Sequence, residues 1–173
     1  MKRSDINPMP PFFDRYINLV EDIDIFEAFE KYSPAYVYSD ITKLTELGDK
    51  IYAPGKWTTK DILQHVIDNE RIMAYRALRF SRNDKTGLPG YEEELFAAST
   101  MANKRTISDL LEEFELVRKT TILLFKNMTD EMMLYNGNAN QTQISALALG
   151  FVIVGHPVHH MHVIRERYFP LLG

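Results

Sequence analysis

The stretch TISDLLEEFELVRKTTILLFKNM, residues 106–128, decides the class of fold. Thr106 is followed three residues later by Asp109, a pair typical of a capping box at the start of a helix. The residues after this pair place one stripe of side chains along a helix: Ile107, Leu110, Leu111, Phe114, Val117, Thr121, Leu124, Phe125 and Met128. The stretch is therefore predicted to be an amphipathic helix that packs one side against other helices.

A second helix is predicted from about residue 58 to residue 81, because Thr58 and Asp61 form another capping box. The connection from this helix to Thr106 is polar and contains two glycines and a proline. At roughly twenty residues, it has the length that is typical of a functional or crossover loop.

Two more helices are predicted outside this pair. One runs from about Asp24 to the residue before Gly48. Within it, Ser33-Pro34 is either a kink or the start of a shorter helix, since proline suits a first turn. The last helix runs from about Thr142 to Tyr168. Four amphipathic helices, a long crossover loop and no strand pattern predict an all-α four-helix bundle.

A single domain is expected, because 173 residues with 45% hydrophobic side chains can bury one substantial core. Residues 1–23 are predicted to form an N-terminal arm, with a short helix at about residues 12–20 that packs the arm down. Residues 24–173 are predicted to form the bundle.

The composition excludes several classes of function. The formal net charge is −4 and the basic residues are scattered among acids, so nucleic acid is not an expected partner. There is no cysteine, which excludes disulfides, thiolate zinc sites and a cysteine nucleophile. Asp5, Asn7 and three prolines interrupt the N-terminal region where a signal peptide needs an apolar run. The longest apolar run, Ile144–Val154, is short for a membrane span. We therefore expect a cytoplasmic protein with no membrane partner.

Four of the five histidines lie between residues 156 and 162. His156 and His160 are four residues apart and share one helical face with apolar residues, so both rings should point into the core. His159 lies at the edge of that face and His162 points away from it. Two inward histidines at this spacing are a minimal helical chelate for zinc or a similar metal. His65, on the core side of the second helix, is the candidate third ligand.

Two other interpretations apply to the histidine pair. Histidines on an apolar face are often neutral, hydrogen-bonded core residues without a metal. A zinc peptidase is disfavoured, because its motif needs a glutamate directly after the first histidine and this chain has Pro157 there. Pro157 also removes a helix hydrogen bond, which predicts a local bulge or kink beside the site.

Three segments resemble the DinB/YfiT-like superfamily: Tyr52-Ala-Pro-Gly-Lys-Trp-Thr-Thr-Lys-Asp-Ile-Leu-Gln-His65, Asp68-Asn-Glu-Arg71, and Gly155-His-Pro-Val-His-His160 leading to Arg165-Glu-Arg-Tyr168. The resemblance spans the chain from about residue 24 onward. It implies a four-helix bundle that binds nickel or zinc through His65, His156 and His160, the same residues that the helical wheel places together. It implies no single reaction, since the family includes thiol-dependent S-transferases, isomerases and members without known activity.

A divalent ion on three neutral imidazoles would keep a charge of +2 and open positions for water, thiolate or carboxylate. Such a site could lower the pKa of a bound water or thiol. Asn69 and Arg76 lie on the His65 side of their helix and are candidate substrate contacts, although Asn69 could be a satisfied core group and Arg76 could end in solvent.

Acidic and basic residues near His65 have simpler explanations. Asp68, Glu70 and Arg71 match the family motif, but Glu70 and Arg71 point away from His65, so salt bridges or a dimer contact are expected for them. The acidic run 92–94 is expected to be solvated, unless one of its carboxylates folds over the metal.

Two classes of function follow from these predictions. The first is a metal-dependent transferase or hydrolase that acts on a small molecule, with thiol-dependent S-transfer as one form. The second is a non-catalytic bundle that binds a metal or a ligand. A homodimer is also predicted, because Ile67, Ala74 and Leu78 form a second apolar side on the helix of His65, unless the N-terminal arm covers it.

Overall fold

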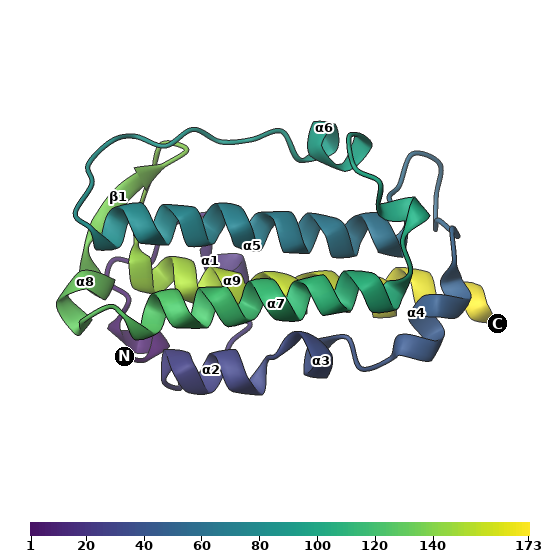
Figure 1. The fold of residues 1–173 in the computed structure, drawn as a ribbon, viewed down its shortest axis with the longest axis horizontal. Coiled ribbons are helices and arrows are strands. Elements are labelled where there is room, and N and C mark those ends of the chain that lie inside the picture. The colour runs from purple at the N-terminus through teal and green to yellow at the C-terminus, as the bar shows by residue number, and fades with distance from the viewer.

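The computed structural model describes residues 1–173 and is a four-helix bundle, as predicted. Three long helices form most of it: α5 (Thr59–Ser81), α7 (Ile107–Lys126) and α9 (Ala146–Val163). α5 packs against both α7 and α9 (Figure 1). The remaining side of the bundle is made by three short helices: α2 (Ile25–Lys31), α3 (Pro34–Val37) and α4 (Ile41–Leu47).

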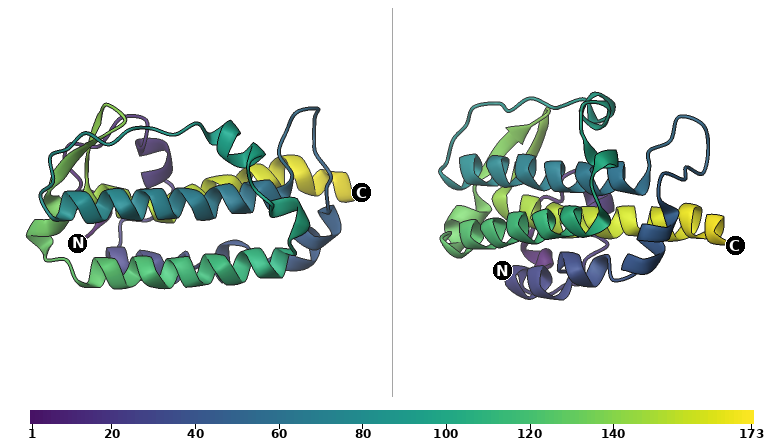
Figure 2. Two further views of the ribbon diagram at one scale, coloured as in Figure 1. Left: turned by 45° about the horizontal axis from the view of Figure 1, so that its top comes forward. Right: turned by 45° about the vertical axis from the view of Figure 1, so that its right-hand side comes forward.

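Smaller elements surround the bundle. The short helices are α1 (Asp14–Ile17), α6 (Glu93–Ala98) and α8 (Asp130–Leu134), and a hairpin is formed by β1 (Asn136–Ala139) and β2 (Thr142–Ser145). Single 3₁₀ turns lie at Arg3–Asp5, Ala102–Lys104 and Phe169–Leu172, and a π-helical turn follows α9 at Ile164–Tyr168. α1 packs on α9, while α2 to α4 run along another side of the bundle (Figure 2).

Both predicted capping boxes are present. The hydroxyl of Thr58 accepts a hydrogen bond from the backbone N–H of Asp61 at 3.1 Å, and the Asp61 carboxylate accepts one from the Thr58 N–H at 3.0 Å. Thr106 and Asp109 repeat this exchange at 3.1 and 3.2 Å. Each pair satisfies donors that the first turn of a helix leaves free, which fixes where α5 and α7 begin.

The helix predicted from Asp24 to Gly48 is divided into α2, α3 and α4. Pro34 is the first residue of α3. Ser33-Pro34 is therefore the start of a shorter helix and not a kink within a long one. Asp24 caps α2, because its carboxylate accepts from the N–H of Phe26 at 2.9 Å.

The prediction that the chain has no strands is wrong. β1 and β2 pair antiparallel, with Ala139 opposite Thr142, and a two-residue turn joins them at Asn140 and Gln141. Both turn residues have positive φ, 50° and 67°, which matches the twist that a tight hairpin needs. The last helix consequently begins at Ala146 instead of Thr142, with the Ser145 hydroxyl accepting from the N–H of Ala148.

The buried core has two apolar clusters with a polar layer between them. One cluster lies at the hairpin end and includes Phe80, Phe125, Phe151 and Ile144, and the other lies at the opposite end and includes Leu63, Phe114 and Ile164. Between the clusters, α5, α7 and α9 contribute Glu70, Arg118 and His156, which are 2%, 2% and 3% exposed. We refer to these three residues as the polar layer.

Within the polar layer, Arg118 binds three partners at once, and one of them is the Tyr32 carbonyl, to which its Nη1 donates at 3.2 Å. It donates to the Glu70 carboxylate through Nε and Nη2, at 3.0 and 2.9 Å, and its Nη2 also contacts the carbonyl of Ile153 at 3.3 Å. Pro157 has no N–H to give that carbonyl, so Arg118 supplies the missing donor. α9 therefore continues through Pro157 without the bulge that was one of the two predicted outcomes, and a kink at this proline stays a prediction.

α9 and the turns after it, Ala146–Leu172, are long and apolar enough to cross a membrane by length and composition, with 72% of the most apolar window buried in the bundle. The sequence criterion of an uninterrupted apolar run found only Ile144–Val154, because histidines and a proline interrupt the longer segment. Since its apolar side chains pack against the other helices, membrane insertion is not indicated.

The second apolar side of α5 packs largely inside the chain. Ile67 is fully buried in one apolar cluster and Ala74 packs against the other, whereas Leu78 is 38% exposed. These contacts remove most of the surface on which the homodimer was predicted, and the oligomeric state stays a prediction.

The contact between α9 and α1 gives a prediction about stability. A Cβ atom at Gly155 would lie 2.0 Å from the backbone carbonyl oxygen of Tyr16, which cannot move without shifting α1. Gly155→Ala should lower the free energy of unfolding by about 1–3 kcal/mol, because overpacking displaces backbone. Chemical denaturation measures this loss. Gly87→Ala, where a Cβ meets no atom within 4 Å, is the control, and equal midpoints for the two variants would contradict the prediction.

Candidate metal centre

Three histidines converge between α5 and α9. His65 comes from α5, and His156 and His160 come from successive turns of α9. The Nε2 atom of His156 lies 3.2 Å from Nε2 of His65 and 3.1 Å from Nε2 of His160. The potential ligand atoms of all three residues lie within 4.8 Å of one another. The structure therefore brings together the three side chains selected from the sequence.

The spacing of these nitrogens fits a shared divalent ion. Imidazole nitrogens bind zinc at about 2.0–2.1 Å, which places neighbouring ligand nitrogens about 3–3.4 Å apart for common coordination angles. The separations of 3.1 and 3.2 Å lie in that range. Hydrogen bonding alone explains the cluster less well, because each N–H···N contact needs one donor and one acceptor and three Nε2 atoms face one another.

The protonation of the cluster also suits a metal. Burial lowers the pKa of His65 to about 4. Burial and the neighbouring His65 lower the pKa of His160 to about 3. Burial, followed by the charges of the adjacent histidines, lowers the pKa of His156 well below its usual value. All three imidazoles are therefore neutral near pH 7 and keep a lone pair available for a cation.

Aromatic rings support the ligand rings from two sides. The Trp57 ring lies 4.9 Å from the His65 ring, and the Tyr16 ring lies 5.1 Å from the His156 ring, measured between centroids. Tyr16 belongs to α1, so the N-terminal arm contributes to the surroundings of the site. These contacts restrict rotation of the two imidazoles, as an outer shell around a metal site does.

The other two histidines lie outside the cluster. His159 is partly buried, and its ring packs 5.4 Å from the Tyr16 ring. His162 is exposed on the far side of α9. Neither belongs to the group of ligand atoms, in agreement with their positions on the helical wheel.

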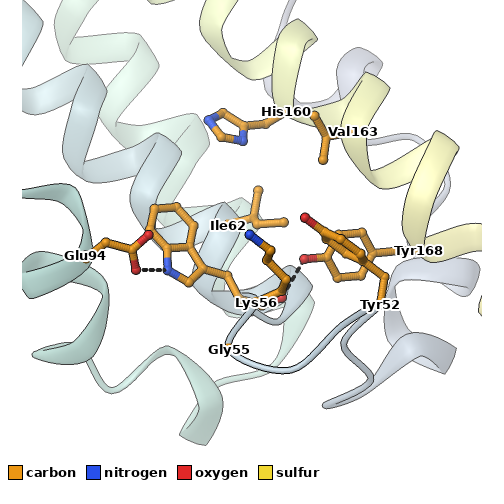
Figure 3. A pocket seen from close by; sticks show the side chains of 9 residues that line it. Tyr52, Gly55, Lys56, Ile62, Glu94, His160, Val163 and Tyr168 are labelled. Atoms are coloured by element: carbon orange, nitrogen blue, oxygen red, sulfur yellow. Dashed lines mark hydrogen bonds between the residues drawn. The ribbon is translucent and has the colours of Figure 1, made fainter.

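A cavity opens beside His160, and we call it the His160 cavity (Figure 3). Its volume is about 170 Å³. Five of its nine lining residues are hydrophobic, and the full set is Tyr52, Gly55, Lys56, Trp57, Ile62, Glu94, His160, Val163 and Tyr168. The cavity gives a small molecule access to the histidine cluster.

Two hydrogen bonds hold the wall of this cavity. The indole N–H of Trp57 donates to the Glu94 carboxylate at 3.0 Å, and the Tyr168 hydroxyl donates to the Trp57 carbonyl at 2.6 Å. Trp57 and Tyr168 were not predicted as site residues, and Glu94 was considered only as part of the acidic run 92–94. A cluster of two aromatic residues and a lysine around Gly55, which adopts a φ of 74°, was the available signal.

Asn69 and Arg76 lie on α5 beneath the loop that follows it. The Asn69 amide donates to the Tyr91 hydroxyl at 2.9 Å, and its Oδ1 is buried without a partner. Arg76, 4% exposed and not solvated as one interpretation held, donates to the Pro89 carbonyl at 2.7 Å. Neither residue lines the His160 cavity, and substrate contact by these side chains stays a prediction.

The charged residues of the family motif have structural roles. Glu70 pairs with Arg118 in the polar layer. Arg71 contacts Asp68 at 3.6 Å and Glu113 at 2.7 Å near the surface. From the acidic run 92–94, Glu94 reaches Trp57, and none of the three carboxylates joins the histidine cluster.

Comparisons with known proteins identify the family and the fold of the chain. The model of the DinB superfamily matches residues 39–164. Among solved structures, YfiT from Bacillus subtilis, described as a probable metal-dependent hydrolase with an unusual four-helix bundle topology, superposes with a TM-score of 0.68. The identity is 17%, over 82% of this chain and 85% of that one, so the likeness shows the fold. The search of curated proteins gave no match. Because the family model covers most of the bundle and all three clustered histidines, the chain belongs to the DinB superfamily.

Proposed function

We propose that this protein is a metal-dependent enzyme that hydrolyses a small molecule or transfers a group from it. The observation that carries the proposal is the convergence of three neutral imidazoles beside a cavity large enough for a small ligand. The description of YfiT as a probable metal-dependent hydrolase supports it.

The number of ligands favours catalysis over a structural metal. Structural zinc sites are closed by four protein ligands, whereas catalytic sites keep a position open. No fourth His, Cys, Asp or Glu belongs to the cluster of His65, His156 and His160. This observation disfavours the alternative of a non-catalytic bundle with a structural metal.

We propose zinc or nickel as the ion, because neutral imidazole ligands suit both and the chain has no thiolate to select a softer metal. When bound, such an ion supplies a Lewis acid that lowers the pKa of a water or thiol nucleophile. His65, His156 and His160 would hold the ion, while Trp57 and Tyr16 pack against two of the rings. The apolar side chains of Ile62 and Val163 line the cavity beside His160.

Hydrolysis and thiol-dependent S-transfer differ in the nucleophile that displaces the leaving group, which is water in the first and a thiol in the second. An assay of an ester panel with and without a small thiol separates them, since a transferase turns over only when the thiol is present.

The predicted homodimer is a separate proposal and is tested by light scattering at micromolar concentration, where a monomer would exclude it.

Removal of the metal provides the direct test. Untagged protein, chelated and dialysed, should regain stability when zinc or nickel is added. An ion whose free concentration is about one hundred times its dissociation constant raises the free energy of unfolding by roughly 2.7 kcal/mol. A thermal melt measures this as a rise in melting temperature. A melting temperature that added metal does not change would reject the metal centre and the enzyme built on it.

A further inference from the structure

Two hydrogen-bond donors point into the His160 cavity, the ammonium of Lys56 and the hydroxyl of Tyr52 (Figure 3). Lys56 forms no ion pair and no side-chain hydrogen bond with the rest of the chain. The Tyr52 oxygen accepts a hydrogen bond from Arg167 at 3.2 Å, so its own hydrogen is free to be donated. The cavity is therefore lined by two donors, one on the exposed Lys56, that no acceptor of the protein binds.

The charges around these donors favour an anion. The guanidinium of Arg167 lies 5.4 Å from the centre of the Tyr52 ring and adds a positive charge next to that side chain. Glu94 is the acidic residue of the lining, and its carboxylate is bound by the indole of Trp57 and makes no ion pair with Lys56. An anionic group placed between Lys56 and Tyr52 would meet two donors, while the Glu94 carboxylate of the lining is engaged by the Trp57 indole.

The remaining walls set the size of the ligand. Ile62, Val163 and the rings of Trp57 and Tyr168 are apolar surfaces around a volume of about 170 Å³. An apolar cavity of about 150 Å³ accommodates benzene. The apolar part of a ligand in this cavity therefore has about the size of one six-membered ring.

We propose that the His160 cavity selects a small organic anion, with its apolar body between the aromatic walls and its carboxylate bound by Lys56 and Tyr52. This orientation leaves the other end of the molecule towards His160. The proposal rests on the proposed function for the identity of the reacting centre, and it adds the chemical class of the substrate.

Benzoate and its neutral analogue benzamide are suitable probes, added to the full chain reconstituted with zinc. Trp57 is the single tryptophan of the chain and lines the cavity, so its fluorescence reports binding directly. Benzoate should bind roughly ten-fold more tightly than benzamide, as expected for a charge-assisted hydrogen bond. Lys56→Met should remove that preference and leave benzamide binding unchanged, while Lys56→Arg should keep it. Tyr52→Phe should weaken benzoate binding a few-fold.

Lys119→Met is the matched control, because it removes the same charge from an exposed position on α7. Equal benzoate affinity in wild type and Lys56→Met, with zinc content intact, would show that the ion alone binds the carboxylate and would overturn the inference. If the protein takes up no zinc, the proposed function fails. The Lys56-dependent preference, measured on that same metal-free protein, still decides the inference.

Discussion

His160→Ala should abolish metal binding and turnover together. Two imidazoles hold a divalent ion much less firmly than three, and His160 is the ligand that also lines the cavity. Metal analysis after dialysis should therefore find no bound metal in the variant. Its melting temperature should not change when zinc or nickel is added. Without the ion, the stabilisation of roughly 2.7 kcal/mol expected at one hundred times the dissociation constant is absent.

His162→Ala is the control for this variant. It removes the same side chain from the same helix, two residues away, but on the exposed side. It should bind metal, melt and turn over like the wild type. A His160→Ala protein that retains full metal content would show that the three histidines do not share an ion.

Arg118→Ala should cost about 3–5 kcal/mol of unfolding free energy, the range typical of breaking a buried ion pair. The substitution leaves the Glu70 carboxylate buried without a cation and the Ile153 carbonyl without a donor. Urea denaturation measures the loss. If the variant does not fold, the double substitution of Glu70→Leu with Arg118→Met should restore a folded protein, because it removes both charges and keeps volume.

Arg71→Ala provides the comparison at the surface. Arg71 is 48% exposed at its side chain and contacts Glu113 and Asp68, so its removal should cost about 0–1 kcal/mol. A loss for Arg118→Ala as small as that for Arg71→Ala would mean that the buried pair contributes little to the fold.

Local signals explain which elements could be predicted. The capping boxes at Thr58 and Thr106 act within four residues, and the sequence alone therefore located the starts of α5 and α7. The hairpin was missed because its turn, Asn140-Gln141, lacks the glycine that usually marks such turns. The division of residues 24–47 into three helices depends on packing against α7 and α9, which helical spacing does not report.

The site likewise combines residues that local sequence patterns predict with residues that meet only through contacts between distant segments. His156 and His160 were placed by the periodicity of one helix, and His65 by its position on the core side of another. Trp57 and Tyr168 are 111 residues apart and meet through a single hydrogen bond, so no local pattern predicts that they share a cavity. The buried position of Arg76 depends likewise on the loop that folds over it.

The polar layer also determines how far the helices can slide along one another. A shift of one helical turn, about 5.4 Å, would separate Glu70 from Arg118 and leave both charges in apolar surroundings. The alignment of α5 with α7 is thereby set at one height, and the contact of Arg118 with Ile153 sets α9 at the same height. We infer that this buried pair selects the axial register in which His65 comes level with His156 and His160.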